Sequence, residues 1–110
     1  MQMKVAELVH RLGLEVVSGP FEQEISGIYV GDLLSNVMAK AEAGNIWITV
    51  HGHQNVVAVA CLTQAAAVIV AEGFPVEAAA LDKAREHQVT IFRTPLTAVD
   101  VIRKLIELGI

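Results

Sequence analysis

The sequence has one cysteine, few aromatic residues and no long apolar run, and each shortage excludes a class of protein. With Cys61 alone, no disulfide can form within the chain, and we expect this thiol to be buried in an apolar helix. Aromatic residues make up only 5% of the chain and its eight Lys and Arg residues are scattered, so no nucleic-acid surface is expected. No run approaches the ~20 apolar residues that cross a bilayer, and no signal-peptide pattern occurs, which predicts a cytoplasmic protein without membrane contact.

Motifs for phosphate binding and for nucleophilic catalysis are missing as well. Neither GxGxxG nor GxxxxGK[ST] occurs, so the sequence has no dinucleotide fingerprint and no P-loop. Ser35 lacks the glycine pattern of a nucleophile elbow. We therefore expect no cofactor and no catalytic residue of a recognised type.

Apolar residues are abundant for a chain of 110 residues. They make up 54% of it against 18% charged residues, with a mean hydropathy of +0.52 and a net charge of −4. This length predicts one domain, residues 1–110, that is large enough for a core without metal or disulfide. Such a composition predicts a sheet buried on both faces and some apolar surface covered by a partner chain, which favours a homodimer.

Hydrophobic periodicity predicts alternating helices and strands. The expected helices cover residues 3–12, 33–38, 56–63, 74–88 and 98–108, and the expected strands cover 14–18, 24–30, 46–50, 68–70 and 89–92. Asp32, Asn55 and Thr97 stand where helix N-caps are expected. The alternation predicts an α/β fold, a single small domain with a mostly parallel sheet flanked by helices.

The polar turn at residues 51–55 is the strongest candidate site. It follows an apolar strand and precedes an apolar helix, and ligands of open α/β sheets bind beyond the carboxyl ends of the strands. A phosphate or carboxylate could be held there by free backbone N–H groups and the positive end of the helix. The residues predicted at this edge are Asp32, His51, Gly52, His53, Asn55, Gly73 and Arg93, of which Arg93 is the natural partner for an anion.

Simpler interpretations of the same residues stay open. Asn55 and Asp32 could do no more than cap helices. Arg93 could be a surface charge near Glu72. His51 and His53 give only two potential metal ligands, too few for a zinc site, so no metal is expected. Trp47 is expected in the core or in a dimer interface.

Several segments together resemble the DRTGG domain family, in particular its short stand-alone members. They are GIYVGDLLSNVMA, GNIWITVHGHQNVVAVACL, AAVIVAEG and VTIFRTPLTA, in that order over residues 5–108. The resemblance implies the fold of the N-terminal domains of HPr kinase/phosphorylase and of the Mur ligases. It also implies an accessory role, because such domains accompany CBS domains in family II pyrophosphatases and precede some phosphate acetyltransferases.

The chain departs from the two turns that give the family its name. Where longer members carry a GDR-type turn after the third strand, this sequence has Gly52-His53-Gln54-Asn55. Where they carry TGG after the fourth strand, it has Ala71-Glu72-Gly73 and so keeps one glycine of the pair.

These observations favour a non-catalytic regulatory or interaction module that forms a homodimer. It would bind a small phosphorylated or nucleotide-like ligand, or a partner enzyme. Two alternatives stay open. The first is a small hydrolase or transferase that uses His51, His53 and Asp32, with or without metal. The second is a scaffold subunit of a redox or hydrogenase-linked complex.

Overall fold

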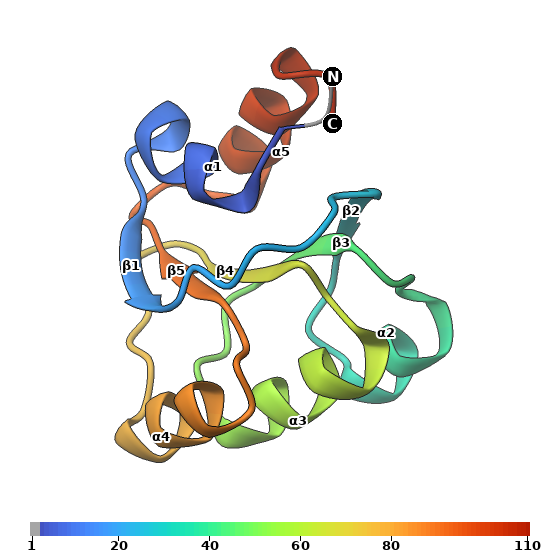
Figure 1. The fold of residues 1–110 in the computed structure, drawn as a ribbon, viewed down its shortest axis with the longest axis vertical. Coiled ribbons are helices and arrows are strands. Elements are labelled where there is room, and N and C mark those ends of the chain that lie inside the picture. Colours follow the sequence, from blue (N-terminus) through green and yellow to red (C-terminus); the bar gives the residue numbers. More distant parts are fainter. Residues whose placement is uncertain (1–2) are drawn as a thin grey trace.

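In the computed structural model, which describes residues 3–110, five helices and five strands follow one another along the chain (Figure 1). Residues 1 and 2 of the predicted domain lie outside the described residues. The strands are β1 (Glu15–Ser18), β2 (Gly27–Val30), β3 (Asn45–Thr49), β4 (Ala67–Val70) and β5 (Ile91–Arg93). The helices are α1 (Val5–Leu12), α2 (Leu34–Lys40), α3 (Gln54–Thr63), α4 (Ala78–Glu86) and α5 (Ala98–Glu107).

The five strands form one sheet in the order β1-β5-β4-β3-β2. Strands β2 to β5 are parallel, whereas β1 pairs with β5 in the antiparallel sense, with Glu15 opposite Arg93. The parallel strands are joined by helices, as βαβ units require. The predicted α/β fold with a mostly parallel sheet is therefore confirmed.

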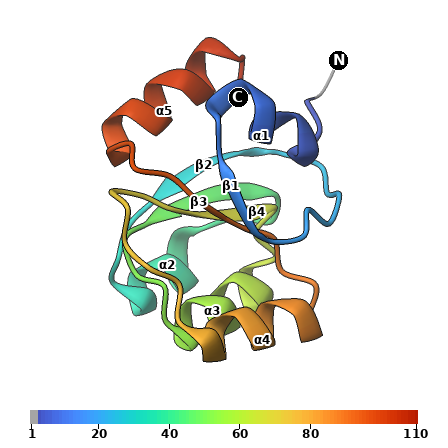
Figure 2. The ribbon, with the colours of Figure 1, turned by 90° about the vertical axis from the view of Figure 1, so that its left-hand side faces the viewer.

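Helices cover both faces of the sheet (Figure 2). α1 and α5 lie on one face, and α2, α3 and α4 lie on the other. Every residue of β3 and β4 is buried between these layers, which explains why their sequences are almost purely apolar. Trp47 is fully buried in the second layer and donates its indole N–H to the Gly31 carbonyl at 2.9 Å, so it belongs to the core of the chain.

The predicted elements are present, but several boundaries and one burial prediction are wrong. α1 begins at Val5 and β2 at Gly27, two and three residues later than predicted. α4 begins at Ala78, because residues 74–77 form a loop in which the Glu77 N–H donates to the Gly52 carbonyl. β5 covers Ile91–Arg93 and starts two residues later than predicted. Cys61 is exposed, because it lies on the side of α3 that faces away from the sheet.

None of the helices within residues 3–110 combines the length and the apolar character that a membrane span requires.

Candidate functional site

Asp32 ties the end of β2 to the end of β3. Its carboxylate oxygen Oδ1 accepts hydrogen bonds from the Thr49 hydroxyl at 2.6 Å and from the Val50 N–H at 3.0 Å. The Thr49 hydroxyl in turn accepts the His51 N–H at 3.3 Å. The prediction that Asp32 caps α2 is wrong: the N-cap is Leu33, which makes no side-chain cap. Asp32 instead fixes the backbone that leads into the polar turn.

His53, and not Asn55, is the N-cap of α3. Its ring nitrogen Nδ1 accepts the backbone N–H of Asn55 at 3.0 Å. The predicted cap at Asn55 is therefore wrong, because the helix starts two residues earlier, at Gln54, and places Asn55 in its first turn. The other ring nitrogen, Nε2, lies 3.8 Å from the Glu77 carboxylate, a contact that becomes an ion pair when the imidazole is protonated.

Gly52 is required by a close approach of two backbone segments. A Cβ atom at this position would overlap the Pro75 carbonyl oxygen and come within 2.7 Å of the Val76 Cα. The Gly52 carbonyl also accepts the Glu77 N–H at 2.9 Å. The turn after β3 and the loop before α4 are therefore packed directly on one another.

Arg93 makes three hydrogen bonds to the chain itself. Its guanidinium donates to the carbonyls of Gly73 and Phe74, both at 2.9 Å, and to the Glu15 carboxylate at 2.7 Å. Its acidic partner is Glu15 on the neighbouring strand, which the interpretation of Arg93 as a surface charge near Glu72 did not include. Arg93 thus clamps the turn after β4, and its predicted role as an anion ligand stays a prediction.

Asp32, His51, His53 and Asn55 are all exposed at this edge, but only two of them leave their side-chain polar groups without a hydrogen bond within residues 3–110. Neither His51 nor Asn55 makes a side-chain hydrogen bond to another residue in the range 3–110. The fold thus brings the turns after β2, β3, β4 and β5 to one edge, as expected. Most polar side chains of these turns, however, form hydrogen bonds to other residues of the same chain.

The acid–base and metal alternatives find little support in this geometry. Between Asp32 and either His51 or His53, the described residues show no hydrogen bond and no ion pair. Within residues 3–110, no group of three or more His, Cys, Asp or Glu side chains is arranged to hold a metal ion.

An apolar groove between α3 and α4 was not predicted as a site. Its volume is about 410 Å³, and it is lined by Gln54, Asn55, Val57, Ala58, Cys61, Leu62, Lys83 and His87. It was missed because Cys61, which lines the groove, was predicted to be buried. A usable signal was the absence of any charged residue from Gln54 to Thr63.

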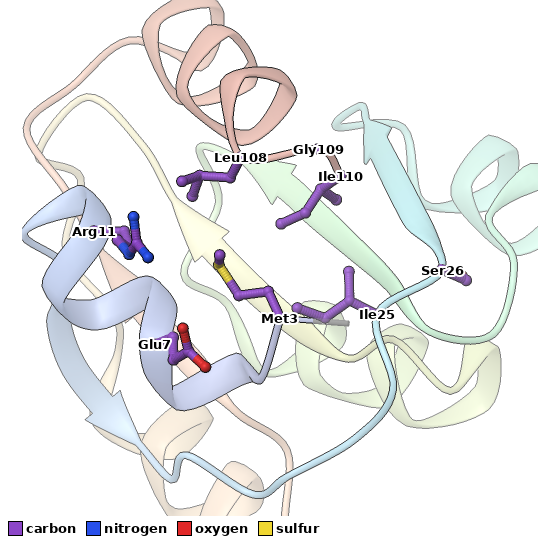
Figure 3. Close-up of a pocket in the computed structure, with 8 residues that line it drawn as sticks. All are labelled: Met3, Glu7, Arg11, Ile25, Ser26, Leu108, Gly109 and Ile110. Carbon is purple, nitrogen blue, oxygen red and sulfur yellow. The ribbon is translucent and has the colours of Figure 1, made fainter. Parts of the chain in front are cut away.

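A second hollow lies on the other face of the sheet, between α1, the end of α5 and the segment before β2 (Figure 3). Its volume is about 310 Å³, and it is lined by Met3, Glu7, Arg11, Ile25, Ser26, Leu108, Gly109 and Ile110. None of the predicted site residues contributes to it.

Comparison with known proteins identifies the family. The family model of the DRTGG domain matches residues 7–108. The chain belongs to the DRTGG domain family. No curated protein sequence matches it.

A solved structure with the same fold is the CBS and DRTGG domain regulatory region of Clostridium perfringens pyrophosphatase, in complex with its activator diadenosine tetraphosphate. The TM-score is 0.75 at 15% sequence identity, over 93% of this chain and 45% of that one. The present chain therefore spans less than half of that structure, and the likeness concerns the fold.

The turn after β4, where the sequence resemblance aligns the TGG turn of longer family members, has two left-handed positions in this chain. Glu72 and Gly73 have φ angles of 60° and 72°, so both positions of the pair adopt the left-handed conformation. Glycine adopts it freely, whereas a residue with a Cβ atom loses about 1 kcal/mol. This DRTGG domain keeps the turn with Glu72 in the first position, held by a hydrogen bond from its N–H to the Leu96 carbonyl at 2.8 Å.

Proposed function

We propose that this DRTGG domain is a non-catalytic regulatory module that acts by binding, as a homodimer and in contact with an enzyme that it regulates. The observation that carries the proposal is the use of the polar groups at the carboxyl edge. Asp32, His53 and Arg93 direct their hydrogen bonds at strands and turns of the same chain. A catalytic acid or base must direct its proton or lone pair at a substrate.

The solved relative supports a regulatory role. Its name describes a DRTGG domain that, together with CBS domains, forms the regulatory region of a pyrophosphatase. A domain of this fold that lacks catalytic machinery would influence an enzyme through protein contacts. Because fold alone does not determine function, this step is an analogy.

The second part of the proposal is that the domain binds a small phosphorylated or nucleotide-like ligand. His51 and Asn55 are exposed beside the first turn of α3, and the amino end of a helix favours anions. The regulatory region of the solved relative is itself in complex with a dinucleotide activator. A ligand at this turn would lie on α3, from which its binding could be passed to a protein contact.

A thermal-shift panel with adenine nucleotides, diadenosine tetraphosphate, pyrophosphate and acetyl phosphate tests this proposal. A ligand at 100 times its Kd adds about 2.7 kcal/mol to stability, which for this size is a rise in Tm of about 10 °C. We expect one of these compounds to raise Tm, and His51→Ala or Asn55→Ala to abolish the rise. If no compound raises Tm, the proposal is reduced to a module that acts through contact with an enzyme. Turnover of any of them that is lost in His53→Ala would contradict a non-catalytic role.

A further inference from the structure

The hollow between α1 and the end of α5 is lined by two charged residues of opposite sign. Glu7 and Arg11 stand one helical turn apart on α1 and so lie on the same side of this helix. This spacing favours an ion pair between them, yet neither residue forms an ion pair within residues 3–110. Figure 3 shows both on the α1 side of the hollow. The hollow therefore offers one carboxylate and one guanidinium to a ligand.

The other side of the hollow is apolar. Leu108 and Ile110, at the end of α5, lie across from the charged residues and pack against the core (Figure 3). Ile25, which is buried, and Met3 continue the apolar lining. The volume of about 310 Å³ is at the lower end of the range for small-molecule sites. The hollow therefore has room for one small molecule with an apolar part.

The other polar side chains next to this hollow are already hydrogen-bonded within the chain. The Ser26 hydroxyl donates to the Ala43 carbonyl at 2.6 Å and accepts the side-chain amide of Asn45 at 3.2 Å. The carboxylate of Glu22 accepts the first two backbone N–H groups of α1, so the amino end of this helix is closed to an anion. Recognition of a polar ligand in the hollow therefore depends on the two charged residues of α1.

The lining of the hollow narrows the class of ligand. An anion such as phosphate would be attracted by Arg11 but repelled by Glu7, and the reverse holds for a simple cation. Within residues 3–110, no group of three or more His, Cys, Asp or Glu side chains is arranged to hold a metal ion. A wholly apolar molecule would take water from both charges and give them no partner. A molecule that carries a carboxylate, an ammonium group and an apolar side chain satisfies every part of the lining.

We propose that this hollow binds a free α-amino acid with an apolar side chain. The guanidinium of Arg11 donates hydrogen bonds to the ligand carboxylate, a pairing that suits its planar geometry. The carboxylate of Glu7 accepts hydrogen bonds from the ligand ammonium group. The ligand side chain packs on Ile25, Leu108 and Ile110. The site shares no residue with the carboxyl edge of the sheet, so the inference does not depend on the ligand proposed for that edge.

Titration of the ¹⁵N-labelled protein with L-leucine, L-methionine and L-phenylalanine, followed by amide NMR shifts, tests the inference. We expect at least one of them to bind and to shift the amides of α1 and of residues 25–26 and 108–110. Arg11→Gln and Glu7→Gln should each raise its Kd roughly tenfold, since each removes a charge-assisted hydrogen bond. Arg85→Gln is the matched control: it removes the same charge as Arg11→Gln, but from an exposed position on α4, on the other face of the sheet, and should leave the Kd unchanged.

Two analogues of the amino acid that binds test the need for both charged groups. Its amide lacks the carboxylate, and the corresponding acid without an amino group lacks the ammonium group. Each should bind roughly tenfold more weakly than the amino acid itself.

Three results would overturn the inference. The first is that none of the three amino acids shifts the amides around the hollow. The second is that the two variants of α1 leave the Kd unchanged. The third is that either analogue binds as tightly as the amino acid, because the ligand would then not be recognised through both charges. Shifts confined to residues 51–55 would also overturn it, and would support the ligand site of the proposed function instead.

Discussion

α3 and α5 are both ten residues long and pack on opposite faces of the same sheet, yet their outer sides differ completely. α5 buries Val101 and Leu105 and carries charges outside, including Asp100 and Arg103 with 3.6 Å between their charged groups. α3 buries its inner side equally well and has no charge anywhere. Burial against the sheet requires one apolar side only, as α5 demonstrates. The second apolar side of α3 therefore needs an explanation outside the fold of the single chain.

Exposed apolar residues alone do not make this difference. α5 also exposes Val99 and Ile106, at 62% and 61%. These two side chains share their helix with Asp100, Arg103, Lys104 and Glu107, whereas the exposed residues of α3 adjoin one another and a groove. Scattered apolar residues are normal on protein surfaces, but a continuous apolar stripe beside a groove indicates binding.

The largest expected effect is on the packing that holds the start of α3 against the loop before α4. Gly52→Ala should lower the free energy of unfolding by about 3 kcal/mol, because the new Cβ atom overlaps backbone atoms of residues 75–76. Urea unfolding of the variant and the wild type measures it.

Gly73→Ala is the matched control for this substitution. It has no atom within 4 Å of the added Cβ, so it should lose only the ~1 kcal/mol of its left-handed φ of 72°. Equal losses of unfolding free energy in the two variants would show that the loop before α4 can move to accommodate the added Cβ atom. The packing of Gly52 on residues 75–76 would then not hold α3 and α4 in a fixed position relative to one another.

A smaller effect compares the amino-terminal caps of the two helices. His53→Ala and Thr97→Ala should each lower the free energy of unfolding by about 1 kcal/mol, since each removes a side-chain acceptor for a backbone N–H of the first turn. His53→Ser should restore most of the loss, and Asn55→Ala should leave stability nearly unchanged. A larger loss for Asn55→Ala than for His53→Ala in thermal unfolding would contradict the assignment of the cap.

The smallest expected effect is a gain in stability at the turn after β4. Glu72→Gly relieves a left-handed φ of 60° and should raise the free energy of unfolding by up to about 1 kcal/mol. The gain should leave self-association unchanged, because Glu72 does not line the groove. A loss of stability in chemical unfolding would mean that the Glu72 side chain supports the turn.

The sequence predicted the fold well where periodicity and turn residues agree. α1 ends at Gly13 with a φ of 64°, and α5 starts at Thr97, whose hydroxyl accepts the Asp100 N–H, both as expected. Residues 56–59 favour a strand by propensity, but the alternation of elements correctly predicted a helix there. The start of α4 was missed because the close packing of Gly52 on residues 75–76 depends on tertiary contacts.

The sequence predicted where the candidate site lies in the fold, but not which hydrogen bonds its side chains make. The turns that carry Asp32, His53 and Arg93 do meet at one edge, as parallel strands require. Which partner each side chain takes depends on distances that no local pattern encodes, such as the pairing of Arg93 with Glu15, 78 positions earlier. Cys61 was misplaced because an uncharged helix gives no sign of which side faces solvent.

The rate at which Cys61 reacts with a maleimide, measured over a wide range of protein concentration, tests most directly whether the proposed homodimer covers the exposed side of α3. If a second copy covers the α3–α4 groove, labelling should slow as the concentration rises in the wild type and in Ile106→Glu, but not in Leu62→Glu. A rate that is the same at every concentration and in all three proteins would contradict the account, because Cys61 would then stay open to solvent in the assembled protein.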